Sequence, residues 1–522
     1  MMMSAFRLRE VIPTIVIVDK KLHHPPPRRR KRGRIHAFFP LVARPGHFSL
    51  LPRPQNANRS SPLIHKTRTI FIATHTHIMC KGATANTKGD VALKQAAAKL
   101  GEHEKWLESF DFAGFAKEMR ALGKELEAAQ GDADVKHLNK MIFWSNSCAA
   151  IGLLSMGFSV NFMTIFCLSL YTCTRWTMIA HHTCHGGYES CHPERKSRWS
   201  RFKFALGSTW RRFCDWFDWM MPEAWNVEHN TRHHYNLSEI HDPDLVEQNL
   251  EDIRNAKIPL VLKYVMVFFS AITWKFLYYA PNTYKELKLA KLRKEGKPIP
   301  EGVSPEKPAG IFTATFGTNG FYTGFEFWSI VVGPYLLIHF ILTPGLYYLV
   351  GDFMMNQQDA IEWSLDGKTM FWNAVTNLVW AELMTNLHSF IIVTTNHAGD
   401  DMYRFRDPCR PFSGSFYLRQ VLASVDFSYG TDPIDFMHGW LNYQIEHHLW
   451  PNLSMLKYQQ SGPRVRAICD KYGVPYIKHN VFYRVKKTVD IMVGNTSMMW
   501  FPEEYEKEFL RMDAELLETK KN

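Results

Sequence analysis

The 522-residue chain lacks the motifs by which redox proteins hold an electron-carrying cofactor. It has no haem-attachment motif, no GxGxxG stretch after a strand, and no CxxxxCxxC spacing for an iron–sulfur cluster. Its nine cysteines form no CxxC pair, and nothing in their spacing requires disulfide bonds. We therefore expect reduced thiols, which suit a site facing the cytosol, and no electron carrier within the chain.

Acidic residues are almost missing from the first 89 residues, which hold 17 Lys/Arg but only Glu10 and Asp19. The net charge of +12 therefore comes from this segment and says little about the main body. A basic run such as 28–34 is more typical of a solvated tail or an address signal than of a nucleic-acid site. We expect residues 1–90 to be a disordered basic extension or a transit peptide, although Met79 would also serve as a start.

Long apolar stretches occur only after this extension. Four of them are each long enough to cross a hydrocarbon core about 30 Å thick: Met141–Val160, Asn161–Ala180, Phe325–Val350 and Met370–His397. A tight turn between Gly157 and Asn161 would join the first two into a hairpin. A fifth stretch, Ile258–Ala280, is expected to lie in the membrane interface, because a fifth crossing would put the following residues on the wrong side.

Charge gives the orientation of these stretches. Seven Lys/Arg lie between Arg195 and Arg212 and six between Lys285 and Lys297, which predicts the cytosolic side. Gly351–Met370 carries four acidic residues against one lysine, which fits the lumenal side.

The predicted architecture is an all-α membrane protein. It has four transmembrane helices, an interfacial helix and a cytosolic helical cap over residues 398–522. By range, we expect a soluble amphipathic helix over 91–135, a membrane domain over 136–490 and a cytosolic tail over 491–522.

Histidine is frequent, at 24 copies, and gathers in three clusters beside the apolar stretches. Two histidines four residues apart share one face of a helix, whereas two adjacent histidines can point to two different metals. A fourth candidate, His397 in TTNHAGDD, ends the last apolar stretch. The clusters are His181 and His185 in HHTCH, His229, His233 and His234 in EHNTRHH, and His447 and His448 in QIEHH after Gln444.

Other polar residues near the clusters are less specific. His182 is equally well a ligand or a neighbour, and His192 and His388 are more typical of surface or core histidines. Three neighbouring acids are expected to cap loops or to orient ligands rather than to bind metal, because carboxylates suit harder cations: Asp242, Asp244 and Glu247.

Neutral imidazoles suit iron, and iron with O2 supplies the oxidant that an unactivated alkyl C–H bond requires. A site at a membrane boundary would let a lipid chain enter from the bilayer. Trp440 and Trp450 are candidates to line or frame such a tunnel.

The three clusters resemble the histidine boxes of membrane fatty acid desaturases, which read HxxxH, HxxxHH and QxxHH in this chain. Gln444 in place of the first histidine of the third box resembles the front-end branch, with delta-4, delta-5, delta-6 and delta-8 enzymes, although sphingolipid desaturases share it. The resemblance covers residues 140–480, and WLNYQIEHHLWPNLSMLKY is its most specific part. It implies two non-haem irons, O2 as co-substrate and a four-span bundle with a cytosolic cap. The chain lacks the HPGG motif of a fused cytochrome b5 domain, which many front-end enzymes carry.

Taken together, these features predict an oxidoreductase that inserts a double bond into an acyl-lipid or acyl-CoA. The catalytic and metal-binding residues would be the seven box histidines, with His397 as a further ligand. A separate donor, cytochrome b5 with its reductase or ferredoxin, would supply electrons in the endoplasmic reticulum or a plastid membrane, respectively. A hydroxylase on the same scaffold, a histidine-rich metal transporter and a non-catalytic lipid-binding protein are the alternatives. Transport is disfavoured because the clusters flank the apolar stretches, and loss of catalysis because no box is broken.

Overall fold

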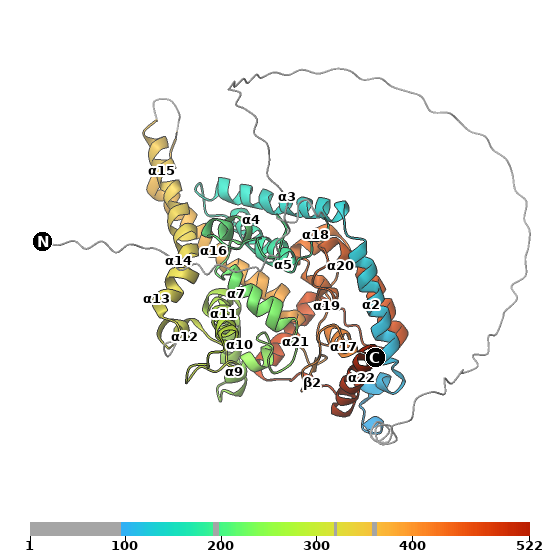
Figure 1. Cartoon of the computed structure of the whole chain (residues 1–522). Coiled ribbons are helices and arrows are strands. Elements are labelled where there is room, and N and C mark those ends of the chain that lie inside the picture. Colours follow the sequence, from blue (N-terminus) through green and yellow to red (C-terminus); the bar gives the residue numbers. More distant parts are fainter. Residues whose placement is uncertain (1–95, 192–197, 318–320, 358–362, 522) are drawn as a thin grey trace, which may run out of the picture. The chain divides into compact units, whose positions relative to one another are not determined.

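The computed structural model describes residues 96–191, 198–317, 321–357 and 363–521, and Figure 1 shows the arrangement of their helices. The described residues belong to one compact unit, 83–522. The predicted extension, 1–90, lies outside the described residues. The only strands in the described part are β1 (Tyr403–Arg404) and β2 (Met499–Trp500), which pair in parallel. The mostly helical fold expected from the sequence is therefore confirmed.

The segment expected as one amphipathic helix over 91–135 contains η1 (Glu102–Ser109), α2 (Phe112–Ala128) and the start of a further helix at Asp132. The break has a local cause, because the Asp111 carboxylate accepts the backbone N–H of Gly114 at 2.9 Å and begins α2 as its N-cap. One face of α2 is buried, as the helical spacing of its apolar residues requires.

A helical hairpin follows, made of α3 (Asp132–Ser155) and α4 (Phe162–Thr174). Asn161 caps α4 by accepting the N–H of Thr164 at 2.9 Å. The turn is also held from α16 (Gly367–Val393), where the Asn377 amide donates to the carbonyls of Met156 at 2.9 Å and Ser159 at 2.8 Å. The turn expected between Gly157 and Asn161 is thus present, and α16 packs along α4.

The chain continues from α4 directly into the helical segments that carry the first histidine box, and the second box lies further along, in η5. Several of these helices are widened π-type turns, which frequently mark functional sites. In order they are η2 (Arg175–Ala180), α5 (His181–Cys184), α6 (Thr209–Arg211), η4 (Arg212–Trp216), α7 (Pro222–Val227), η5 (Glu228–His233), α8 (Val246–Asn249) and α9 (Glu251–Asn255).

The segment expected at the membrane interface, Ile258–Ala280, contains a sharp bend. Helix α10 (Leu260–Ala271) is followed by η6 (Lys275–Tyr279) and α11 (Ala280–Glu295), and the two parts meet at 78°. Together they are long and apolar enough to count as one broken span or one re-entrant segment.

Among the described residues, one straight helical run, Gly324–Met355, is both long and apolar enough to cross a membrane. It lies at the opposite side of the molecule from α2 and α22 in Figure 1. The prediction of four crossings therefore stays a prediction. After α12 (Ile311–Phe316), the run consists of α13 (Gly324–Phe327), η7 (Trp328–Val332), α14 (Gly333–Leu336), η8 (Leu337–Leu342) and α15 (Thr343–Met355).

The C-terminal part is built of helices of 3 to 19 residues, one of which, α19, carries the third box. Buried ion pairs connect them to the rest, as where Arg419 donates to Glu239 at 2.8 Å and to Glu506 at 3.0 Å. The elements are η9 (Thr394–Asn396), α17 (Gly414–Leu422), α18 (Asp432–Met437), η10 (Leu441–Tyr443), α19 (Gln444–Leu449), α20 (Met455–Tyr472), α21 (Val481–Val493) and α22 (Glu503–Lys521).

Candidate metal centre

The first two boxes approach each other through their ring nitrogens. His181 begins α5 and His185 follows its end, so both rings face the same side. The π-turns of η5 turn His229 toward them, and its Nε2 lies 3.2 Å from Nε2 of His181. The same Nε2 lies 3.3 Å from Nε2 of His234. Two helices that are 48 residues apart in sequence thus point four imidazoles at one place.

The third box completes the arrangement from the other side. His447 and His448 lie on α19, where Nε2 of His447 is 2.9 Å from Nε2 of His181. The chain enters this helix through Trp440, whose left-handed conformation (φ 60°) forms a tight turn. The ring of His448 stacks on that of His234, with 4.3 Å between centroids.

The eight predicted ligand residues form two adjoining groups, in each of which one nitrogen per ring lies within 4.8 Å of all the others. All eight are buried. The larger group is His181, His185, His229, His234 and His447, and the smaller is His233, His397 and His448. Two ion positions side by side are therefore available, and His397 belongs to the second.

Burial keeps these rings neutral, with the exception of His233. It lowers the pKa of His185, His229, His234, His447 and His448 well below the usual range, and the neighbouring histidines lower it further. Nε2 of His181 lies only 2.9 Å from that of His447 and 3.2 Å from that of His229, and Nε2 of His185 is buried with no hydrogen-bond partner in the described residues. Buried polar atoms without partners are rare unless an ion or water binds there. Neutral, convergent imidazoles fit divalent iron.

His233 is oriented by a carboxylate. Its Nδ1 lies 2.8 Å from Oδ1 of Asp242, and both side chains are almost fully buried. Burial by itself lowers the pKa of His233, but Asp242 and Asp244 outweigh it and raise this pKa above its usual value. The contact fixes the ring so that Nε2 can face the second group, which is the usual role of a carboxylate behind a metal-binding histidine.

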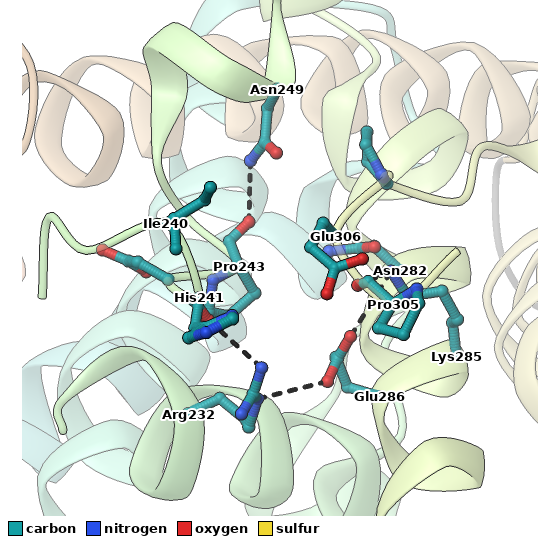
Figure 2. A pocket seen from close by; sticks show the side chains of 12 residues that line it. Arg232, Ile240, His241, Pro243, Asn249, Asn282, Lys285, Glu286, Pro305 and Glu306 are labelled. Carbon is teal, nitrogen blue, oxygen red and sulfur yellow. Dashed lines mark hydrogen bonds and ion pairs between the residues drawn. The ribbon is translucent and has the colours of Figure 1, made fainter. Parts of the chain in front are cut away.

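The loop that carries Asp242 is itself held from its outer side (Figure 2). The Asn249 amide donates to the Pro243 carbonyl at 2.7 Å, and Arg232 donates to the His241 carbonyl at 3.3 Å. Arg232 also lies 3.5 Å from the buried carboxylate of Glu286. A cavity of about 10 Å³ between these groups has room for about one water molecule.

The remaining candidates divide as follows. His182 is buried but outside both groups, and its Nδ1 lies 2.6 Å from the Met178 carbonyl. His388 lies 2.7 Å from the Met437 carbonyl through Nε2, and His192 falls outside the described residues. Asp244 is close enough to His229 and His233 to form a third, smaller group, whereas Glu247 pairs with Arg254 at 3.1 Å.

The side chain of Gln444 lies against two histidines of the second group. Its amide Nε2 lies 2.8 Å from Nε2 of His397 and 3.1 Å from Nε2 of His448. The amide oxygen is buried without a partner in the described residues. The oxygen and the nitrogen of a side-chain amide are assigned from their surroundings, so the two atoms can be exchanged. If the Gln444 oxygen faces the two rings, it adds a ligand atom.

An apolar cavity of about 340 Å³ reaches the second group at His397. Sequence reasoning missed its lining, although the aromatic run after α10, Trp274 to Tyr279, is a visible signal. Trp440 and Trp450 do not line it, contrary to expectation: Trp440 donates to the Met455 carbonyl at 2.9 Å, and Trp450 lies elsewhere. The walls are formed mainly by Val267, Trp274, Leu277, Tyr279, Phe390, Val393 and Met492.

A second, more polar hollow of about 760 Å³ reaches His185 of the first group, and we call it the basic cleft. Arg120, Lys124 and Arg201 line it against one carboxylate, Glu127, together with Trp450. Arg201 pairs with Glu189 at 3.2 Å, while Arg120 and Lys124 make no ion pair within the described part of the chain. The cleft therefore keeps an excess of positive charge.

These features define a helical protein with a buried polyhistidine centre that has room for two metal ions. Comparison with known proteins gives the family. The Fatty acid desaturase family pattern matches residues 159–480, more than half of the chain. The chain belongs to the fatty acid desaturase family, and the matched segment contains all eight histidines.

Individual relatives match over shorter segments. The chain is 33% identical over 127 residues to the NADPH-dependent stearoyl-CoA 9-desaturase of Mycobacterium tuberculosis, covering 24% of this chain and 30% of the relative. It is 35% identical over 66 residues to the sn-1 linoleoyl-lipid 6-desaturase of Arthrospira platensis (13% and 18%). It is 28% identical over 116 residues to the Delta(5) fatty acid desaturase A of Dictyostelium discoideum (21% and 25%). These alignments span less than a third of each relative, and no solved structure matches the chain.

Proposed function

We propose that the protein is a membrane-embedded acyl desaturase that uses two irons. The observation that carries this proposal is the pair of adjoining histidine groups with an apolar cavity ending at one of them. The reaction removes one hydrogen from each of two adjacent carbons and forms a double bond between them. O2 takes up these hydrogens with two external electrons and two protons, and two water molecules leave. Bound iron would supply the activation of O2, because no side chain attacks an alkyl C–H bond.

The residues of the chain have separate roles in this proposal. The two groups, His181, His185, His229, His234 and His447 on one side and His233, His397 and His448 on the other, would hold the irons. Asp242 would keep His233 in a binding orientation. The aromatic and aliphatic walls of the cavity would hold the acyl chain and exclude water from the oxidant.

Exposed apolar side chains support membrane embedding. Leu154 on α3 is 75% exposed, Val261 on α10 is 71% exposed and Leu349 on α15 is 63% exposed. Large exposed apolar surfaces mark membrane or protein contacts. We propose four crossings, α3, α4, the run 324–355 and α16, with α10 in the interface and the C-terminal helices as a cytosolic cap.

Electrons would come from a separate one-electron carrier at the basic cleft. Cytochrome b5 and ferredoxin are acidic, and the cleft carries excess positive charge next to His185. Part of it, Arg201, falls within the basic segment 195–212, which the sequence predicts to lie on the cytosolic side. Opposite charges mainly speed the encounter, so turnover should decrease as salt rises. Cytochrome b5 would place the protein in the endoplasmic reticulum, and ferredoxin in a plastid.

The test is expression of the full chain in yeast fed with oleic, linoleic and α-linolenic acids, followed by gas chromatography of the cell lipids. New polyunsaturated products are expected, with a front-end position if Gln444 marks that branch. Hydroxylated products would show a hydroxylase instead. No product from any fed acid, in cells that contain the protein with two bound irons, would contradict the proposal.

A further inference from the structure

Three charged side chains are buried together away from the histidine groups. The Lys275 ammonium lies 2.5 Å from Oδ2 of Asp218 and 3.5 Å from Oε1 of Glu382. Lys275 and Asp218 have no solvent exposure, and Glu382 is 9% exposed. We call these residues the charged triad. Removing charges from water is costly, and a buried ion pair often adds no net stability, so a triad at this depth calls for a role other than stability.

Glu382 is held in place by further donors. Trp219 Nε1 donates to its Oε1 at 2.7 Å, and Asn386 donates to the same oxygen at 3.1 Å. The Tyr335 hydroxyl donates to Oε2 at 3.1 Å. Both carboxylate oxygens of Glu382 are therefore fixed, and the triad has one defined geometry rather than a choice of several.

The triad joins segments that lead to the metal centre and the cavity. Asp218 comes shortly before α7 and η5, which carry the second box. Lys275 begins η6, whose neighbours Trp274 and Leu277 line the apolar cavity. Glu382 lies on α16, the helix that leads to His397.

The first box is connected through an aromatic contact. The Lys275 ammonium lies 5.6 Å from the ring centre of Trp176, a cation–π contact. Trp176 lies on η2, which continues directly into α5 with His181. The Trp176 ring in turn lies 6.0 Å from Trp274 and 6.1 Å from Tyr279, both in the cavity wall.

A second set of contacts holds the bend between α10 and η6 against α16, the helix that carries Glu382. Asn386 accepts the backbone N–H of Lys275 at 3.0 Å through its side-chain oxygen. The backbone carbonyl of Asn386 accepts Nε1 of Trp274, also at 3.0 Å. The position of this cavity wall along α16, and hence its distance from His397, is therefore set at the triad.

We propose that Lys275, Asp218 and Glu382 form a positioning site that sets the cavity against the histidine groups and so selects the carbon atoms that are oxidised. This inference rests on the proposed desaturase function. Neighbouring carbons of an acyl chain are about one bond length apart, and misplacement on the order of 1 Å costs roughly a hundredfold in rate. A small shift of this wall therefore lowers the rate at the native position and exposes a neighbouring carbon to the oxidant.

The test measures double-bond position. The full chain and its variants are expressed in yeast fed with linoleic acid and α-linolenic acid, and the double bonds of new products are located by mass spectrometry. Iron per chain is measured on the purified proteins. The first variant is the double substitution Asp218→Asn with Lys275→Met, which removes both charges of one ion pair. The second is Glu382→Gln, which leaves the Lys275–Asp218 pair with zero net charge. Lys457→Met is the matched control, because it removes another buried ammonium, 3.6 Å from Asp134, outside the cavity wall.

For the double substitution we expect about a tenfold or greater loss of product at the native position. The fraction of displaced double bonds should rise, with iron content unchanged. Glu382→Gln should show the same change to a smaller degree, and Lys457→Met should keep the native position. If the double substitution does not accumulate, Glu382→Gln decides by the same readout.

Two results would overturn the positioning role. One is turnover and position like those of the unsubstituted chain. The other is lower turnover with every double bond still at the native position, since that would be a purely structural effect. If the unsubstituted chain forms no unsaturated product at all, the desaturase function itself is contradicted, which is a separate outcome.

Discussion

Replacing Asp242 by Asn should weaken binding of the second metal ion while leaving the fold in place. The carboxylate accepts three N–H groups: Nδ1 of His233 at 2.8 Å, the backbone of Ser238 at 2.9 Å and the backbone of Asp244 at 2.9 Å. An amide has only one acceptor oxygen. In the Asp242→Asn variant the –NH2 group would therefore face an N–H donor, either that of Ser238 or those of His233 and Asp244.

The size of the effect follows from these contacts. A hydrogen bond to a charged group contributes about 1.5–3 kcal/mol, and every ~1.4 kcal/mol corresponds to a tenfold change in a binding constant. Loss of the His233–Asp242 contact therefore predicts a decrease in metal affinity of roughly 10- to 100-fold, as is usual for residues that orient metal-binding histidines. The first group contains no residue in contact with Asp242, so its ion should remain.

The measurement is iron per purified chain, by mass spectrometry of the metal, after dialysis against a series of buffered iron concentrations. The unsubstituted protein should hold close to two irons, and Asp242→Asn close to one at low free iron. Glu247→Gln is the control, because it removes a carboxylate charge in the same region, where its partner is Arg254 rather than a histidine. Two irons retained by Asp242→Asn at every concentration would refute the role given to Asp242.

Three further results are expected. His397→Ala should lose the iron of the second group and all turnover while the protein still accumulates in membranes, and full turnover would remove His397 from the ligand set. Lys124→Glu should raise the KM for the electron donor several-fold and flatten the salt dependence, with stability unchanged, because Lys124 lines the cleft and makes no ion pair among the described residues. A glycosylation tag near residue 366 should be modified in microsomes and one near residue 297 should not; modification at 297 would show that α10 and η6 cross.

The sequence alone picks out the histidines that the structure brings together, because box spacing is a local property. Residues four apart on a helix share a face whatever surrounds them, and His181 with His185 follows this rule, whereas His229 and His233 fall into different main groups. The chemistry of neutral imidazole then points to iron. The mostly helical fold follows from apolar runs in the same way, and the hairpin turn before Asn161 from its turn-forming residues.

Only the tertiary structure decides how these local units are combined. The adjacent residues His233 and His234 belong to different groups. The reason is that the π-turn of η5 and the position of α19 set which ring nitrogens meet. The cavity wall and the charged triad bring together Asp218, Lys275 and Glu382, which are far apart in sequence. Such contacts depend on packing between distant segments, and no periodicity in one segment encodes them.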